Sequence, residues 1–253
     1  MFAPLTEALI RDAGISAGQT VLDVAGGSGE PSLTIAERVG PLGAVTCTDA
    51  VAEMVAAAES EARRRGLTNV TFRECLADSL PFESGSCDAV VCRLGVMFFP
   101  DPLAALREML RVAKPGGSVS LAVWHKNELN PFTHLATDVM SRYLESPPAD
   151  PDAPNAFRFA ELGKLAGILG LAGAGNVHER VFRFQMVAPI SASEYWELRS
   201  ETSDTLRAKL LQLPVDQLLP VQQWVQEAVS EYFPNGQMNF PAQMIIVTGM
   251  KPE

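Results

Sequence analysis

Short apolar runs alternate with amphipathic stretches along the first half of the chain. Apolar runs of about five residues predict buried β-strands, whereas apolar positions that recur every three or four residues predict helices. The predicted strands lie at about 20–24, 44–48, 70–75, 87–92 and 117–124. The predicted helices lie at about 3–13, 31–40, 50–65 and 102–112. Strands that alternate with helices in this way predict an α/β fold with a parallel sheet.

The second half of the chain has a less regular pattern. Its predicted elements are a proline- and aspartate-rich loop at 145–156, a helix at Phe159–Leu171, strands at 177–187 and 243–250, and a helical block at 191–233. Pro214 and Pro220 are expected to break the helical block, because proline removes a backbone donor.

The first predicted strand leads directly into a glycine-rich segment. Val21–Val24 is apolar apart from Asp23, and Gly26, Gly27 and Gly29 follow. A buried strand that runs through glycines into a helix N-terminus is a typical ligand-binding point of an open α/β sheet, because residues without a Cβ let the backbone approach the ligand. A carboxylate there would repel a pyrophosphate, but it suits a ligand with an ammonium and a sulfonium group.

Two other interpretations of this segment stay open on the loop alone. It could be a glycine-rich turn without a ligand. It could also be a dinucleotide-binding loop, since the fingerprint G-x-G-x-x-G/A aligns with Gly27–Ser32, where Ser32 takes the place of the third glycine.

Two further strands lead into acidic residues. Asp49 ends the second strand and could accept hydrogen bonds from both hydroxyls of an adenosine ribose. Asp78 follows the third strand and could accept one from an adenine amino group. A single acid before a turn is usually a turn residue. Three acids at successive strand ends beside a glycine loop instead favour a nucleoside-binding site.

An ordered set of segments over about residues 18–124 carries a family resemblance. The segments are Val21–Glu30, Asp49, Ala77–Phe82, Cys87–Cys92 and Val112–Gly117. With them the chain resembles the class I S-adenosylmethionine-dependent methyltransferases, of the small-molecule type grouped with the ubiquinone/menaquinone-biosynthesis methyltransferases. One departure is Ala25, which stands where the family pattern D-x-G-x-G-x-G has its first glycine and often has alanine or cysteine.

The resemblance implies S-adenosylmethionine as cofactor and S-adenosylhomocysteine as its product. It places the residue that matches Asp23 near the methionine ammonium, Asp49 on the ribose and Asp78 on the adenine. The expected cofactor contacts are Asp23, Ala25, Gly26, Gly27, Gly29, Asp49, Ala77, Asp78, Ser79 and Arg93.

The resemblance also implies a Rossmann-like, seven-stranded, mostly parallel sheet with an antiparallel last strand and a helical cap insertion. The strands at 177–187 and 243–250 would complete this sheet. We therefore expect a methyltransferase domain of residues 1–190 and 239–253, and a cap or lid of residues 191–238 inserted over the carboxyl edge of the sheet.

The charge of the chain argues against a nucleic-acid substrate. Its 30 acidic and 20 basic residues give a formal charge of −10, whereas nucleic-acid binding depends on basic residues that meet phosphates. The basic cluster Arg63–Arg65 precedes Gly66 and is expected to complement the dipole of a helix end. The fourth strand is also not followed by the Asn/Asp-Pro-Pro-Tyr signature of methyltransferases that act on nucleic acids or glutamine.

Other functional classes lack their signals. No run reaches the ~18 apolar residues of a membrane span, and no G-x-S-x-G or G-x-x-x-x-G-K-[ST] motif marks a hydrolase or an NTPase. The 4 cysteines contain no C-x-x-C pair, which favours a reducing cytoplasm. His125, His134 and His178 lack metal-ligand spacing, so no metal site is expected.

Methyl transfer requires the protein mainly to hold nucleophile, methyl carbon and sulfur in line. His125 follows the fifth strand and is the candidate general base, because histidine titrates near neutral pH; a structural histidine is the alternative. Arg93 follows the fourth strand and could orient an anionic group or pair with a neighbouring acid. The candidate substrate contacts are Met97, Phe98, Trp124 and Tyr195.

The sequence therefore predicts a methyltransferase that transfers a methyl group to O or C of a small, apolar or aromatic acceptor, with a homodimer left open. An NAD(P)-dependent oxidoreductase and a catalytically silent S-adenosylmethionine-binding protein are the alternatives. Formation of S-adenosylhomocysteine in the presence of an acceptor separates the first function from both.

Overall fold

A computed structural model describes residues 1–141, 150 and 152–253 of the protein. Its contacts divide these residues into two compact units, which we describe one at a time. The larger unit consists of Ala3–His125, Asp152–Phe182 and Met244–Glu253. The smaller unit consists of Met1–Phe2, the described part of 126–151, and Arg183–Gln243.

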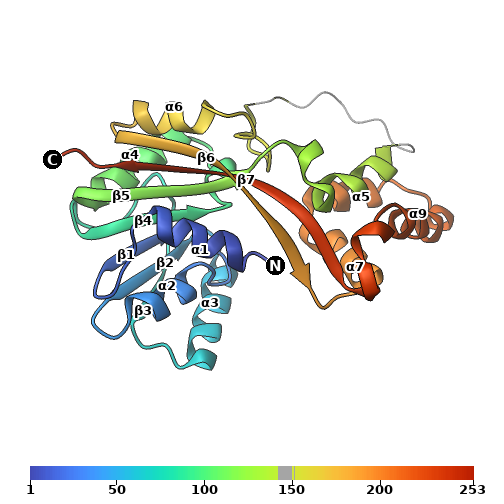
Figure 1. Ribbon diagram of the computed structural model, residues 1–253, viewed down its shortest axis with the longest axis horizontal. Coiled ribbons are helices and arrows are strands. Elements are labelled where there is room, and N and C mark those ends of the chain that lie inside the picture. Colours follow the sequence, from blue (N-terminus) through green and yellow to red (C-terminus); the bar gives the residue numbers. More distant parts are fainter. Residues whose placement is uncertain (142–149, 151) are drawn as a thin grey trace. The chain divides into compact units, whose positions relative to one another are not determined.

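Within the described residues, seven strands form one sheet in the order β3-β2-β1-β4-β5-β7-β6 (Figure 1). They are β1 (Thr20–Val24), β2 (Ala44–Asp49), β3 (Val70–Glu74), β4 (Cys87–Arg93), β5 (Ala113–Trp124), β6 (Gly175–Ala188) and β7 (Met238–Met250). Strands β1 to β5 pair in parallel, and β7 pairs antiparallel with β5. The predicted α/β fold with a mostly parallel, seven-stranded sheet is confirmed.

Strand β1 lies in the interior of the sheet between β2 and β4. From β1 the chain moves outward through β2 and β3, then crosses back to β4 and continues to β5. The strand order therefore reverses at β1, and the carboxyl end of β1 is the point where open α/β sheets bind ligands.

Five helices belong to the larger unit: α1 (Ala3–Asp12), α2 (Ser32–Val39), α3 (Ala52–Arg65), α4 (Pro102–Val112) and α6 (Lys164–Leu171). Because parallel crossovers are right-handed, α2 and α3 cover one face of the sheet and α4 covers the other. The first four helices agree with the predicted ranges to within two residues. Asp101 caps the N-terminus of α4, since its Oδ1 accepts a hydrogen bond from the Ala104 backbone N–H at 2.9 Å.

Two boundaries in this unit differ from prediction. Helix α6 begins at Lys164 rather than at Phe159, because Gly163 has a φ of +83°, which a right-handed helix does not allow. Strand β5 begins at Ala113 rather than at 117, so the segment that ends α4 is already part of the strand.

The smaller unit contains α5 (Pro131–Ser141), α7 (Ala192–Thr202), α8 (Asp204–Leu210) and α9 (Val215–Ala228), with parts of β6 and β7. Its core is aromatic. Tyr195 is fully buried, lies 5.2 Å from Phe240 and 5.5 Å from Phe132 between ring centroids, and donates a hydrogen bond from its hydroxyl to the Phe132 carbonyl.

Helix α5 was not predicted, and it packs against α8 and α9. The helical block expected at 191–233 is present, but only one of its prolines interrupts it. Pro214 precedes α9, whereas Pro220 lies inside that helix, where the buried side chains of Val221 and Val225 offset one missing backbone bond. The cap boundaries at 191 and 238 stay a prediction, and most of the loop expected at 145–156 lies outside the described residues.

None of the helices in the described ranges has the length and apolar character needed to cross a bilayer.

Candidate functional site

The loop between β1 and α2 has a backbone that ordinary residues rarely adopt. Ala25, Gly27 and Gly29 all have positive φ, at +58°, +57° and +116°. The position of Ala25 thus requires the left-handed conformation, which explains why the D-x-G-x-G-x-G pattern has glycine there. Gly26 is required for a different reason, because a Cβ at this position would lie 2.6 Å from Asp23 Oδ2 and 2.7 Å from Cys47 Sγ.

Asp23 is fully buried at the end of β1. Its Oδ2 accepts hydrogen bonds from the backbone N–H of Ser32 at 3.1 Å and from the Ser32 hydroxyl at 2.5 Å. Its Oδ1 is buried and has no hydrogen-bond partner among the described residues. Burial raises the pKa of Asp23 to about 7, against the lowering effects of the Ser32 hydrogen bond and the positive charge of Arg93.

Asp49 links the end of β2 to the glycine loop. Its Oδ2 accepts from the Gly27 backbone N–H at 2.9 Å, and its Oδ1 accepts from the Val51 backbone N–H at 3.0 Å. Each carboxylate oxygen has more than one acceptor position, so these bonds leave capacity for hydroxyl donors of a ligand.

A cavity of about 360 Å³ opens at the carboxyl ends of β1 to β4. Its lining residues are Val24, Ala25, Asp49, Ala50, Cys75, Leu76, Ala77, Asp78, Leu94, Gly95, Phe98, Phe99, Pro100, Asp101 and Ala105. Four of the predicted cofactor contacts therefore meet around one cavity, namely Ala25, Asp49, Ala77 and Asp78. Asp23, Gly26, Gly27, Gly29 and Ser79 do not line it, although the glycines shape the loop that does.

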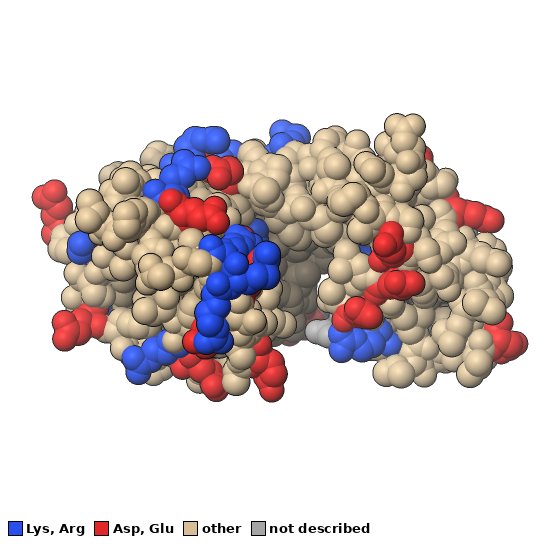
Figure 2. Space-filling view, turned by 90° about the horizontal axis from the view of Figure 1, so that it is seen from below, with Lys and Arg blue, Asp and Glu red and all other residues tan. Residues whose placement is uncertain are grey.

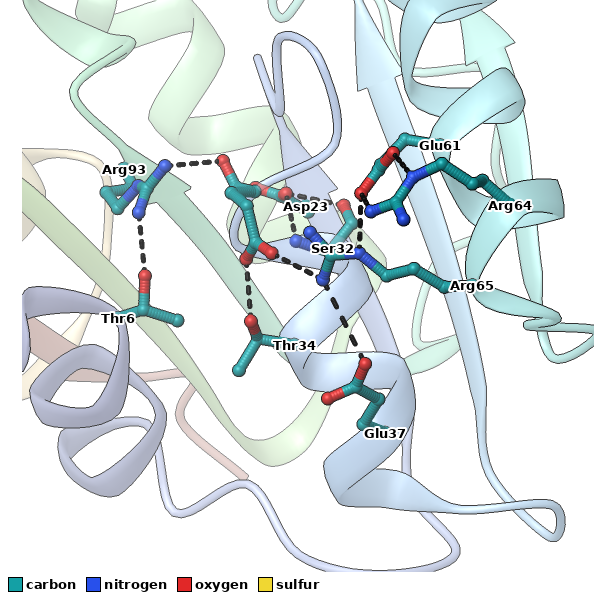
Figure 3. Close-up of polar contacts among 10 residues, drawn as sticks. Thr6, Asp23, Ser32, Thr34, Glu37, Glu61, Arg64, Arg65 and Arg93 are labelled. Atoms are coloured by element: carbon teal, nitrogen blue, oxygen red, sulfur yellow. Dashed lines mark hydrogen bonds and ion pairs between the residues drawn. The ribbon is translucent and has the colours of Figure 1, made fainter. Parts of the chain in front are cut away.

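Arg93 lies at the end of β4 but does not line the cavity. Figure 3 shows its guanidinium beside Thr6 of α1, to whose hydroxyl Nη1 donates at 2.7 Å. Nη2 donates to the backbone carbonyl of Glu30 at 2.9 Å. The Glu30 carboxylate in turn accepts from the Thr34 hydroxyl and from Arg65 of α3. This network ties the end of the glycine loop to α1, α2 and α3.

His125 is buried just after β5, and its Nδ1 lies 2.7 Å from the Ala160 carbonyl oxygen. Because a carbonyl only accepts hydrogen bonds, Nδ1 carries the proton and Nε2 of the neutral ring carries the lone pair. The fold thus selects the tautomer that a general base acting through Nε2 would need. The base role itself stays a prediction.

The four predicted substrate contacts lie in different surroundings. Phe98 lines the cavity with 51% of its surface exposed. Met97 and Trp124 are buried and do not line it, and Tyr195 belongs to the core of the smaller unit. Their roles toward a substrate stay predictions.

Part of the wall formed by Leu94–Asp101 was missed from the sequence: Phe98 was among the predicted substrate contacts, whereas Leu94 and Gly95 were not. Leu94 and Gly95 directly follow β4, so the strand-end argument that found Asp78 could have found them. Arg158 carried no such signal: its Nη1 donates to the Phe99 carbonyl at 2.6 Å from a residue 59 positions away in the sequence.

The surface carries mixed charge. Arg63, Arg64 and Arg65 at the end of α3 pair with Glu59 or Glu61, and Figure 2 shows basic side chains beside acidic ones. Within the described ranges, no group of three or more His, Cys, Asp or Glu side chains could hold a metal ion.

Comparison with known proteins adds independent evidence on the family. A model of the ubiE/COQ5 methyltransferase family matches residues 6–143. An uncharacterized protein of Mycobacterium tuberculosis is 41% identical over 124 residues, which cover 49% of this chain and 44% of that protein. The ubiquinone/menaquinone biosynthesis C-methyltransferase UbiE of Hahella chejuensis is 36% identical over 133 residues, 52% of this chain and 53% of that protein. The chain thus spans about half the length of these curated relatives.

Solved structures share the fold. A putative methyltransferase of Bacillus halodurans superposes with a TM-score of 0.63 at 19% identity, over 98% of this chain and 99% of that chain. A phosphoethanolamine N-methyltransferase 2 of Haemonchus contortus, in complex with phosphomonomethylethanolamine and S-adenosylhomocysteine, has a TM-score of 0.58 at 19% identity, over 99% of this chain and 53% of that chain. These likenesses show the fold alone. Because the family model covers more than half of the sequence, the chain belongs to the ubiE/COQ5 methyltransferase family.

Proposed function

We propose that the protein binds S-adenosylmethionine in the 360 Å³ cavity and transfers its methyl group to an oxygen or carbon of a small, apolar or aromatic acceptor. The observation that carries this proposal is the convergence of Asp49 and Asp78 on one cavity beside the left-handed backbone of Ala25. Family membership supports it independently.

The residues present fit this cofactor. Asp49 would accept from the ribose hydroxyls, and Asp78, which is exposed in the cavity wall, would accept from the adenine amino group. The family resemblance assigns Asp23 to the ammonium group of the methionine moiety, and its side chain is buried behind the residues that line the cavity. A buried carboxylate oxygen without a hydrogen bond is costly, and a cationic ligand group near Asp23 Oδ1 would offset that cost.

The cofactor supplies an electrophilic methyl group, so the protein needs to hold the acceptor in line and receive a proton. The acceptor would lose its O–H or C–H proton as its oxygen or carbon takes the methyl group, and the methyl–sulfur bond of the cofactor would break to leave S-adenosylhomocysteine. His125 is our candidate for receiving that proton on Nε2, because its Nδ1–H is already committed to the Ala160 carbonyl.

The apolar character of the acceptor is inferred from the cavity wall. Phe98, Phe99 and Leu94 present apolar surface to the cavity, and the Phe98 side chain is half-exposed. An exposed aromatic side chain at the mouth of a cavity suits contact with an apolar or aromatic partner. The location in the cytoplasm and a homodimer stay predictions from the sequence.

Calorimetry with S-adenosylhomocysteine, S-adenosylmethionine and NAD tests the cofactor. We expect binding of the first two and no response to NAD; tight NAD binding without any response to S-adenosylhomocysteine would end the methyltransferase interpretation. A panel of phenols, quinols, amines and fatty acids, assayed for S-adenosylhomocysteine formation, then tests the acceptor. Binding without turnover on any of these classes would favour a catalytically silent protein.

A further inference from the structure

Arg158 contacts the wall of the cavity without lining the cavity itself. Its Nη1 donates a hydrogen bond to the backbone carbonyl of Phe99, a lining residue, at 2.6 Å. The guanidinium also lies over the ring of Phe159, with its Cζ 5.5 Å from the ring centroid. Because the Phe159 side chain is buried, this ring gives the arginine a fixed support from which to hold the wall.

The short turn that carries Arg158 is itself held at several points. The backbone N–H groups of Phe157 and Arg158 both donate to Asn155, to its Oδ1 at 2.8 Å and to its carbonyl at 3.2 Å. The Ala160 N–H donates to the Phe157 carbonyl at 3.0 Å. Ala160 is buried, and its carbonyl accepts from Nδ1 of His125 at 2.7 Å. One turn therefore holds both the apolar wall and the candidate base.

The wall benefits from this support because its own backbone is strained. Leu94, at its start, has a φ of +61°, a left-handed conformation that is unfavourable for a residue with a Cβ. Val96–Phe98 then form a single 3₁₀ turn. The Phe98 side chain is half-exposed, so packing fixes only part of its surface. The bond from Arg158 to the Phe99 carbonyl holds this turn at its far end.

We propose that Arg158 is a positioning residue for the methyl acceptor: by holding the Phe99 carbonyl, it keeps the rings of Phe98 and Phe99 in the arrangement that contacts the apolar part of the acceptor. This inference rests on the proposed function, because it presumes an apolar or aromatic acceptor in the cavity. It deepens that function, because it assigns acceptor affinity to a residue that does not touch the acceptor.

The expected effect follows from the fraction of molecules in which the wall is held. A hydrogen bond from a charged donor favours the conformation that contains it by a factor of about ten or more. A ligand that binds only the held wall loses affinity in proportion to the fraction of molecules that retain it. Cofactor affinity should not depend on Arg158, because the expected cofactor contacts Asp49 and Asp78 lie at or after the ends of β2 and β3.

The experiment uses 2-naphthol, an uncharged aromatic alcohol whose fluorescence changes when it leaves water, as the acceptor probe. Its Kd is measured for the full chain saturated with S-adenosylhomocysteine, and the Kd of S-adenosylhomocysteine is measured separately by calorimetry. Arg158→Met removes the donor but keeps an unbranched side chain, whereas Arg158→Lys keeps a cationic donor. Lys164→Met is the matched control, because it removes a second cation over the Phe159 ring, whose centroid lies 6.0 Å from the Lys164 Nζ of α6.

We expect the wild type, Arg158→Lys and Lys164→Met to bind 2-naphthol with Kd values within about threefold of one another. Arg158→Met should weaken 2-naphthol binding about tenfold while its Kd for S-adenosylhomocysteine stays within about threefold of wild type. Wild-type affinity for 2-naphthol in Arg158→Met overturns the proposal. Equal losses of both ligands in that variant, or an equal loss of 2-naphthol in Lys164→Met, also overturn it.

If Arg158→Met does not fold by circular dichroism, Arg158→Gln takes its place under the same criteria, because its amide is too short to reach the Phe99 carbonyl. A wild-type protein that binds S-adenosylhomocysteine but not 2-naphthol contradicts the apolar acceptor and overturns this inference with it. A wild-type protein that binds neither compound instead refutes the proposed function.

Discussion

Replacing Asp49 by alanine should weaken cofactor binding more directly than any other single change in the cavity wall. The side chain lies at the end of β2, lines the cavity, and accepts hydrogen bonds from the backbone N–H groups of Gly27 and Val51. The substitution therefore removes the proposed ribose acceptor and also one bond that holds the glycine loop.

The expected magnitude follows from these bonds. A hydrogen bond to a charged group contributes about 1.5–3 kcal/mol, and Asp49 would make two of them to the ribose. Water can replace part of this interaction in the alanine variant. We therefore expect a loss of about 1.4–4 kcal/mol, which raises the Kd of S-adenosylhomocysteine about tenfold to about a thousandfold.

The assay is calorimetry with S-adenosylhomocysteine, together with thermal unfolding to confirm the fold. Glu74→Ala is the matched control, because Glu74 is an exposed acid at the register position opposite Asp49 on β3 and does not line the cavity. It removes the same charge without removing a proposed ligand contact, and its Kd should change less than about threefold. An unchanged Kd for a folded Asp49→Ala protein would show that Asp49 serves only the turn.

Three further changes probe the site. Gly26→Ala places a Cβ 2.6 Å from Asp23 Oδ2 and 2.7 Å from Cys47 Sγ. The substitution should lower the free energy of unfolding by about 1–3 kcal/mol and abolish S-adenosylhomocysteine binding. A wild-type melting temperature and Kd would show that the loop has room to shift. Burial raises the pKa of Asp23 from 3.8 in the unfolded chain to about 7 in the fold, so between these pH values the folded state holds a proton that the unfolded state has lost. The contribution of Asp23 to the free energy of unfolding should therefore fall by up to about 4 kcal/mol as pH rises from about 4 to about 7, and it should level off above pH 7. The free energies of unfolding of wild type and Asp23→Asn, measured by denaturant titration, should diverge over this pH window. Parallel pH dependences of the two proteins would contradict the raised pKa of Asp23. His125→Gln should lower kcat at least about a hundredfold while leaving the Kd of S-adenosylhomocysteine unchanged; an unaltered kcat would make His125 structural.

The central sheet and the cofactor end of the site follow from local sequence. Apolar runs predict the parallel strands, and residues that directly follow parallel strands meet at one edge of a sheet. That rule predicted that Asp49 and Asp78 lie at one cavity, as the structure shows. The requirement for glycine or a small residue at position 25 is equally local, because it depends on one backbone angle, a φ of +58° at Ala25.

The contacts of Arg93 could not be derived in this way. Arg93 ends β4 as Asp49 ends β2, yet its partners Thr6 and Glu30 lie 87 and 63 residues away in the sequence. The same limit applies to Arg158, which supports the cavity wall from 59 residues away. Strand-end position predicts which edge a side chain reaches, but its contacts there depend on how distant elements pack.

The helices beyond residue 125 show the same division. Apolar periodicity predicted α7 and α9 as helical, but Pro220 lies inside α9 against its local propensity, and α5 was not predicted at all. Local patterns determine structure where each segment's own backbone preferences and burial agree, as in the glycine loop and the parallel strands. Where burial of apolar side chains against distant segments outweighs a local preference of a few kcal/mol, only the tertiary structure decides.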